Sequence, residues 1–159
     1  MFRFIQLILL CVLFFVSGCS NSLQPKDLPK LYSCVITITQ EGKPLDGATV
    51  ELVVTDHENS KYKSLAITDV EGKAIMSTYG HNGVPVGKYK AVVTKEITDD
   101  IVYKENESGG KDLVSYKKYK MVEEQFSDPQ ITSHEIEITG KGKVAKTFDV
   151  GKAIRQLVK

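Results

Sequence analysis

The fold is indicated by one alternating stretch, ATVELVVT at residues 48–55. Its apolar side chains Ala48, Val50, Leu52 and Val54 are expected to share one face, because successive side chains of a β-strand point to opposite sides of the sheet. The side chains between them are mostly polar. A strand with one apolar and one mixed face is typical of an antiparallel sheet that buries a single side.

The same period-two pattern recurs on both sides of this stretch, and turn-rich segments separate the repeats. Further strands are expected at residues 32–39, 63–68, 73–79, 88–93, 133–139 and 144–150. About seven short strands at this spacing favour an all-β fold built as a single antiparallel β-sandwich, as in immunoglobulin-like domains. The length of 159 residues, with 42% hydrophobic and 26% charged residues, suits one globular domain.

Two connections between successive strands are expected to be turns, the first of them in a hairpin. The segment Asp69-Val70-Glu71-Gly72 ends in a glycine, which supplies the positive φ that tight turns require. It is expected to join the strands at 63–68 and 73–79, with Leu65 and Ile67 facing inward. The last two strands, at 133–139 and 144–150, are expected to be joined by a turn at residues 140–143.

The alternation stops in residues 97–127, where acids, lysines and glycines predominate. This segment is expected to be a disordered or partly helical excursion, and for residues 115–126 a short helix and a loop remain alternatives. The dipeptide Asp128-Pro129 ends the excursion, because the residue before a proline avoids helical backbone angles. The tail at 151–159 has apolar residues at helical spacing but is too short to form a helix alone.

Residues 1–18 have the pattern of a secretory signal peptide, with Arg3 before an apolar run at 4–16. The run suits a signal peptide and is too short to span a bilayer core of about 30 Å. It ends in Val16-Ser17-Gly18-Cys19, which resembles the lipobox of bacterial lipoproteins. An ordinary signal peptide with an unmodified Cys19 is the alternative.

The lipobox resemblance implies that the mature chain begins at Cys19 and that its sulfur carries a diacylglyceryl group, with fatty acids such as palmitate. Several acyl chains anchor a protein stably to membrane lipid, and the polar, proline-containing residues 19–31 would then form a lipidated, flexible tether. The residue after Cys19 is Ser20. An aspartate at this position would resemble the inner-membrane retention signal of Gram-negative lipoproteins. We therefore expect an exported cell-envelope protein, in the outer membrane of a Gram-negative source, facing the periplasm or the surface.

Four patches carry a resemblance to a known family. They are Gly42-Lys43-Pro44-Leu45-Asp46-Gly47-Ala48, Thr68-Asp69-Val70-Glu71-Gly72-Lys73, Gly83-Val84-Pro85-Val86-Gly87-Lys88-Tyr89-Lys90-Ala91-Val92-Val93 and Phe126-Ser127-Asp128-Pro129. In this order and spacing they resemble the carboxypeptidase regulatory-like domain, in its single-domain bacterial lipoprotein form. The resemblance implies a transthyretin-like (prealbumin-like) sandwich over residues 32–150, acting as a folding, linker or adhesion module without catalytic residues.

The sequence offers little support for an enzyme. Its three histidines, His57, His81 and His134, are dispersed, and no HExxH, CxxC or Gly-x-Ser-x-Gly motif is present. After loss of Cys11 and modification of Cys19, Cys34 is the remaining thiol, and its alternating apolar context predicts a buried, inert side chain. We expect no catalytic residues, no metal and no cofactor. An enzyme would instead require one of the histidines to lie beside an acidic or nucleophilic group.

The expected function is a non-catalytic binding or structural module with an unknown envelope protein as partner. The alternative is a prealbumin-like carbohydrate-binding module. Glycan sites stack sugars on aromatic rings, and because the chain has no tryptophan, Tyr79 beside His81 in a glycine-rich loop is the candidate ligand site. Tyr103, Tyr116 and Tyr119 are the other candidates. The formal net charge of +1 gives no reason to expect a nucleic-acid partner.

Overall fold

The structure is a computed structural model that describes residues 27–55 and 61–158. The expected signal segment 1–18, the lipidation residue Cys19 and His57 lie outside the described residues. Within the described ranges, no helix has the length and hydropathy needed to cross a bilayer.

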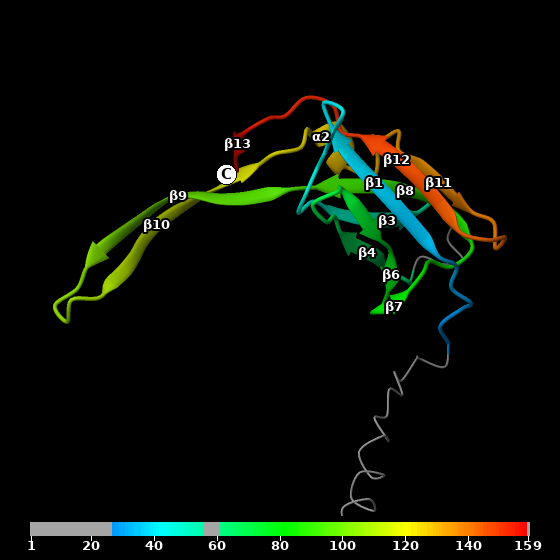
Figure 1. Ribbon diagram of the computed structural model, residues 1–159, viewed down its shortest axis with the longest axis horizontal. Helices are drawn as coiled ribbons and strands as arrows, with labels where there is room; N and C mark the ends of the chain where they lie inside the picture. The colour runs from blue at the N-terminus through cyan, green and yellow to red at the C-terminus, as the bar shows by residue number, and fades with distance from the viewer. Residues whose placement is uncertain (1–26, 56–60, 159) are drawn as a thin grey trace, which may run out of the picture.

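Two facing β-sheets form a sandwich, which confirms the all-β prediction (Figure 1). In the first sheet β12 (Val144–Asp149) pairs with β1 (Cys34–Gln40), which also pairs with β2 (Lys43–Pro44) and β5 (Lys73–Ile75). The second sheet has the order β11 (Glu135–Ile138), β8 (Gly87–Thr94), β3 (Thr49–Val54), β4 (Ser64–Ile67), β6 (Ser77–Thr78) and β7 (His81–Asn82).

The core lies between these two sheets and is filled by alternate residues of their central strands. The inward side chains include Cys34, Ile36 and Ile38 from β1, Val50 and Leu52 from β3, and Tyr89, Ala91 and Val93 from β8. Ala48, Val50 and Leu52 are buried and Val54 packs partly against the same core, as the alternation in residues 48–55 predicts. Burying one face of each sheet against the other removes both apolar faces from water.

The predicted orientation of β4 is wrong. Leu65 and Ile67 are 47% and 66% exposed, whereas Ser64 and Ala66 face the core. The register of β4 against β3 places Ala66 opposite the buried Val50, and a shift by one residue would reverse both faces. The inward Ser64 hydroxyl is satisfied by a hydrogen bond with the Thr78 hydroxyl at 2.7 Å, so a polar side chain is tolerated in the interior.

The hairpin predicted between residues 63–68 and 73–79 is confirmed only in part. The turn at Asp69–Gly72 forms, and β4 pairs in the antiparallel sense with β6, the end of the predicted second strand, but β5, the beginning of that strand, crosses to the other sheet and pairs with β1. The connection between the last two strands joins the two sheets, because β11 pairs with β8, whereas β12 pairs with β1 and runs parallel to it. At these two connections, strands that follow one another in the chain thus lie in opposite sheets and bury their apolar side chains in the same core from its two sides. Two strands paired in one flat hairpin would lie on the same side of the core.

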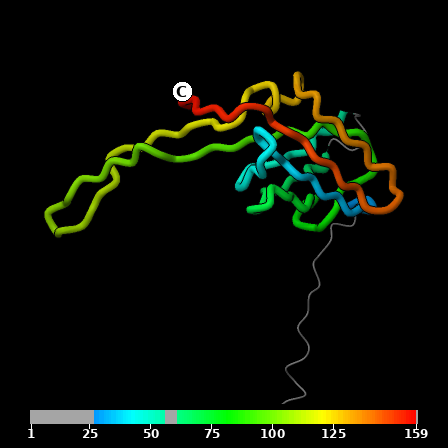
Figure 2. Tube along the Cα trace, turned by 45° about the horizontal axis from the view of Figure 1, so that its top comes forward, coloured from blue at the N-terminus to red at the C-terminus, as the bar shows by residue number. Residues whose placement is uncertain are grey.

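Residues 97–127 do not form a disordered excursion. β9 (Glu96–Glu105) and β10 (Lys111–Lys120) make a long antiparallel hairpin that projects from the sandwich (Figures 1 and 2). Only the end of the segment is helical, in the single turn α2 (Glu124–Ser127). Both faces of this ribbon are exposed to solvent, so neither face needs to be apolar. For this reason the sequence of residues 97–127 shows no alternation of apolar and polar side chains.

The C-terminal tail is extended instead of helical. Its strand β13 (Gln156–Leu157) pairs with the base of β10, with Leu157 opposite Tyr119 and Gln156 opposite Lys120. The three strands β13, β10 and β9 form a separate small sheet. We refer to residues 96–120, which include β9, β10 and the turn between them, as the arm.

Candidate functional site

The arm is the most distinctive exposed feature of the molecule. Its outer part carries large apolar side chains that are 46 to 59% exposed: Ile101, Val102, Tyr103, Leu113, Val114 and Tyr116. A two-stranded ribbon is marginally stable in water by itself, and contiguous exposed apolar surface marks a contact site. We refer to residues 101–116 as the distal arm.

The end of the arm is held in shape by local hydrogen bonds and opposite charges. Asn106 Oδ1 accepts hydrogen bonds from the backbone N–H groups of Ser108 and Gly110 at 3.2 and 2.8 Å. Before and after this turn, Glu105 lies opposite Lys111, and Lys104 lies opposite Asp112. Opposite charges at facing positions stabilise paired strands, so the distal arm presents its apolar side chains from an ordered ribbon.

Within that ribbon, Tyr103 lies directly opposite Leu113, and facing residues of an antiparallel pair share one face. The register shifts between Leu113 and Ser115 and again between Ser115 and Lys117. β-bulges of this kind twist a strand and re-aim its side chains. The sequence did contain a signal for this hairpin, because two apolar runs flank a turn-forming Asn-Glu-Ser-Gly-Gly segment.

An ion-pair cluster braces the base of the arm. The Arg155 guanidinium lies 2.8 Å from Asp99 and 3.8 Å from Asp100, and its centre lies 4.2 Å from the centroid of the Tyr119 ring. The Tyr119 hydroxyl donates to Asp100, and Lys117 lies 3.3 Å from the same carboxylate. These donors lower the pKa of Asp100. The tail therefore fixes the arm at its base, whereas the distal arm extends beyond it.

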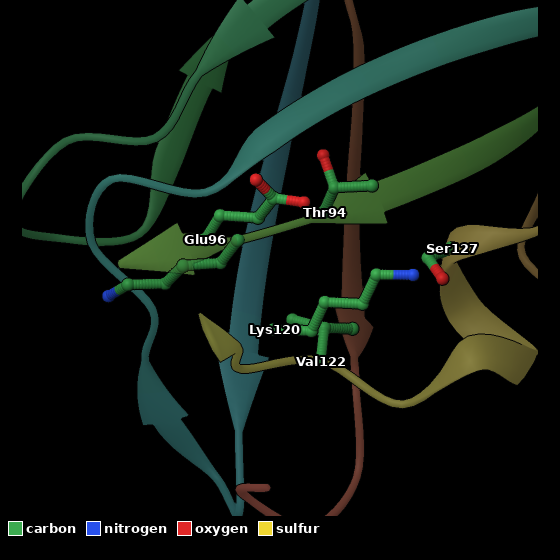
Figure 3. Close-up of a pocket in the computed structure, with 6 residues that line it drawn as sticks. Thr94, Glu96, Lys120, Val122 and Ser127 are labelled. Atoms are coloured by element: carbon green, nitrogen blue, oxygen red, sulfur yellow. The ribbon is translucent and has the colours of Figure 1, made fainter. Parts of the chain in front are cut away.

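A small pocket lies where the arm joins the sandwich (Figure 3). It is lined by Thr94, Lys95, Glu96, Lys120, Val122 and Ser127, and in the close-up the Lys120 side chain extends toward Ser127. Its volume of about 170 Å³ is below the roughly 300–1,000 Å³ typical of small-molecule sites. The pocket is better suited to a few water molecules at the root of the arm than to a substrate.

The structure places the predicted ligand residues Tyr79 and His81 on one small hairpin. Tyr79 and Gly80 form the two-residue turn between β6 and β7, both with positive φ, as type I′ turns require. The Tyr79 hydroxyl donates to the Lys61 carbonyl, and its ring lies edge-on to Tyr62 with centroids 6.3 Å apart. His81 lies opposite Thr78. Tyr79 thus packs the rim of the sheet, and its glycan-binding role stays a prediction.

The structure does not bring the described histidines together. His81 lies on β7 and His134 immediately precedes β11, and these strands are at opposite edges of the six-stranded sheet. In residues 27–55 and 61–158, no group of three or more His, Cys, Asp or Glu side chains is positioned to hold a metal ion. Cys34 is buried, as predicted, and burial raises the pKa of its thiol to about 11.

His134 occupies a packing position between two phenylalanine rings. Its ring stacks on Phe126 and Phe148 with centroid distances of 5.0 and 4.5 Å. The side chain is buried, and its Nδ1 has no hydrogen-bond partner. Burial lowers the pKa of His134, an effect opposed by a backbone hydrogen bond with Asp149 and by its carboxylate, and reinforced by Lys146.

This arrangement predicts a pH-dependent stability. Below the ordinary histidine pKa of 6.5, His134 is protonated in the unfolded chain but stays neutral in the folded chain. The free energy of unfolding therefore falls as the pH falls from 6.5 toward the lower pKa of the folded state. One proton contributes at most about 1.4 kcal/mol per pH unit. Thermal unfolding between pH 7.5 and 5 measures this loss, and His134→Phe is expected to remove it.

The matched control is His81→Asn, which alters a histidine on β7 that does not stack on either phenylalanine. This variant should keep the wild-type pH dependence. Parallel pH profiles for the wild-type protein and His134→Phe would show that burial of His134 does not contribute to it.

Comparisons with known proteins add no family assignment. No family model matches the sequence, and no curated protein matches it. Among solved structures, a 9R-lipoxygenase from Cyanothece PCC8801 shows 14% identity and a TM-score of 0.29 over 84% of this chain and 18% of that enzyme. A similarity this low supports no conclusion about fold or activity. The resemblance to the carboxypeptidase regulatory-like domain stays a prediction.

Proposed function

We propose that this chain is a lipid-anchored protein of the cell envelope whose sandwich presents the arm to another envelope protein and takes no part in catalysis. The observation that supports this proposal is the projecting ribbon with six large apolar side chains about half exposed. None of the residues 96–120 belongs to the core of the sandwich, and the distal arm lies beyond the bracing tail. Contact with a partner would remove that apolar surface from water.

The proposal predicts that partner binding depends on the distal arm. The double variant Tyr103→Ser and Leu113→Ser removes a facing apolar pair from the arm and is expected to reduce capture of a saturable protein partner from solubilised envelope by at least tenfold. A tenfold loss corresponds to about 1.4 kcal/mol of binding free energy. Burial of two apolar side chains of this size in an interface would contribute more than that. Quantitative mass spectrometry of proteins retained by the immobilised full chain measures the effect.

The matched control removes two apolar side chains of the sandwich that are somewhat more exposed than the arm pair, in Ile67→Ser and Ile75→Ser. These residues are 66% and 64% exposed and lie on β4 and β5. This control should capture the partner as the wild-type protein does. If the arm variant and the wild-type protein capture equal amounts, the arm is not the contact and the proposed function is wrong.

The lipid anchor is the second part of the proposal and is supported by the residues at 1–19. The segment Val16-Ser17-Gly18-Cys19 follows an apolar run of signal-peptide length. Labelled palmitate is expected to enter the wild-type protein and to be absent from Cys19→Ser, because the variant lacks the sulfur that forms the thioether. The control Cys34→Ser should be labelled normally. Equal labelling of the wild-type protein and Cys19→Ser would contradict the anchor.

A further inference from the structure

β9 is an edge strand along its whole length. In the described part of the chain it pairs only with β10, and the sheet order is β13, β10, β9. The corresponding edge of β10 is partly covered, because β13 pairs with Tyr119 and Lys120 and the Val158 N–H donates to the Lys118 carbonyl at 2.9 Å. Outside the β-bulge between Asp99 and Val102, where the register with β10 shifts and Asp100 has a φ of +51°, alternate backbone N–H and C=O groups of β9 face away from β10. Another strand could pair with these groups.

The composition of β9 suits an edge that pairs with a further strand better than an edge that stays exposed to water. Proteins commonly protect an exposed edge with prolines, lysines or β-bulges. β9 has one bulge, at Asp100, next to its apolar centre. β9 has no proline and a single lysine, and its centre is the consecutive apolar run Ile101, Val102 and Tyr103, each about half exposed. Because neighbouring side chains of a strand point to opposite faces, this run offers apolar contact on both faces of an added strand.

The charges of the arm are divided between its strands. β9 has four acidic residues and one lysine, for a net charge of −3, whereas β10 has four lysines and one aspartate, for a net charge of +3. The covered edge of β9 is thus already paired with a lysine-rich strand. We infer that the free edge of β9 binds, by strand addition, an extended lysine- or arginine-rich segment of a partner protein with apolar residues at its centre. This inference rests on the proposed function.

A second copy of this chain fits the edge less well. Pairing β9 with β9 would bring together two strands that each carry a net charge of −3. Pairing β9 with the β10 of another copy in the antiparallel sense would set two arms side by side, displaced by two strand spacings, or about 10 Å. The attached sandwiches contain a six-stranded sheet, which is about 29 Å wide at about 4.8 Å per strand, and would overlap.

The probe for this inference is a capped synthetic peptide with the sequence of β10, KDLVSYKKYK. The matched control is the same peptide with its four lysines replaced by glutamate. In detergent-solubilised full chain, fluorescence anisotropy is expected to show at least tenfold weaker binding of the control peptide at low ionic strength. Added salt should weaken binding of the lysine peptide, because exposed charges are screened.

Amide hydrogen exchange locates the bound peptide. At saturation, the alternate β9 amides that face away from β10 are expected to exchange at least tenfold more slowly, and the β10 amides should be unchanged. Unchanged β9 exchange, equal binding of both peptides, or loss of protection in β10 through strand replacement would each overturn strand addition. A stable dimer of the unliganded full chain in sedimentation, with those β9 amides protected, would overturn it in favour of a second copy.

This experiment separates the inference from the proposed function. If Tyr103→Ser and Leu113→Ser abolish partner capture while the peptide leaves β9 exchange unchanged, the arm is the contact but partners bind its side chains and not its backbone edge. If the double variant captures the partner normally, the proposed function fails even where the peptide adds to β9.

Discussion

Gly72→Ala is expected to destabilise the protein by about 3–5 kcal/mol. Gly72 has a φ of +73°, and a Cβ there would lie 2.4 Å from the Ile38 carbonyl oxygen. Left-handed backbone costs an L-residue about 1–2 kcal/mol, and moving Ile38 away from Gly72 disturbs two hydrogen bonds. These run from Leu45 N–H to Ile38 O at 3.0 Å and from Ile38 N–H to Gly72 O at 2.8 Å, and each contributes about 1–1.5 kcal/mol.

Gly42→Ala is the matched control for this prediction. Gly42 has nearly the same φ, +74°, but a Cβ there would meet no atom within 4 Å. Its expected loss is therefore only the conformational part, about 1–2 kcal/mol. Urea unfolding followed by circular dichroism measures both variants. Equal losses at the two positions would show that the contact with β1 does not constrain the turn.

Ile36→Ala is expected to destabilise the protein by about 2–5 kcal/mol, the usual range when a buried isoleucine is truncated to alanine. Ile36 is fully buried on β1. This strand pairs with β12 on one side and with β2 and β5 on the other, so the sheet has little freedom to collapse around the cavity. The same denaturation experiment measures the effect.

Ile75→Ala tests the same truncation on the neighbouring strand. Ile75 is 64% exposed, and it lies opposite Val35 in the same sheet as Ile36. The expected loss is below about 1 kcal/mol, within the range of strand propensities. A loss at Ile75 as large as that at Ile36 would mean that the core does not lie between the two sheets.

The strands of the sandwich could be predicted wherever one face is buried. The alternation at residues 48–55 gave the inward face of β3 correctly, because burial of one side leaves a period of two in the sequence. In β4 the same reasoning failed. The inward residues Ser64 and Ala66 are small or polar, and the larger Leu65 and Ile67 face solvent. Hydrophobicity alone could not anticipate the hydroxyl pair that satisfies Ser64 inside the core.

The candidate contact surface was missed for the opposite reason. The distal arm is exposed on both faces, so its sequence has no apolar stripe, and residues 97–127 were expected to be disordered or partly helical. Only the turn at Asn106 and the β-branched residues beside it indicated a hairpin. The tail that braces the arm through Arg155 is more than thirty residues away in the chain, beyond the reach of local patterns.

The sequence by itself determined that the chain is an all-β protein, where most of its strands lie, and that Gly72 ends a tight turn. Side-chain alternation and glycine conformation are local properties, and both can be read from neighbouring residues. Only the tertiary structure decided that the connections cross between sheets, that β12 runs parallel to β1, and that the arm projects with a free edge. Strand pairing depends on backbone hydrogen bonds between distant segments, and the backbone is the same at every residue, so the choice of partner is set by how all the apolar faces pack into one core.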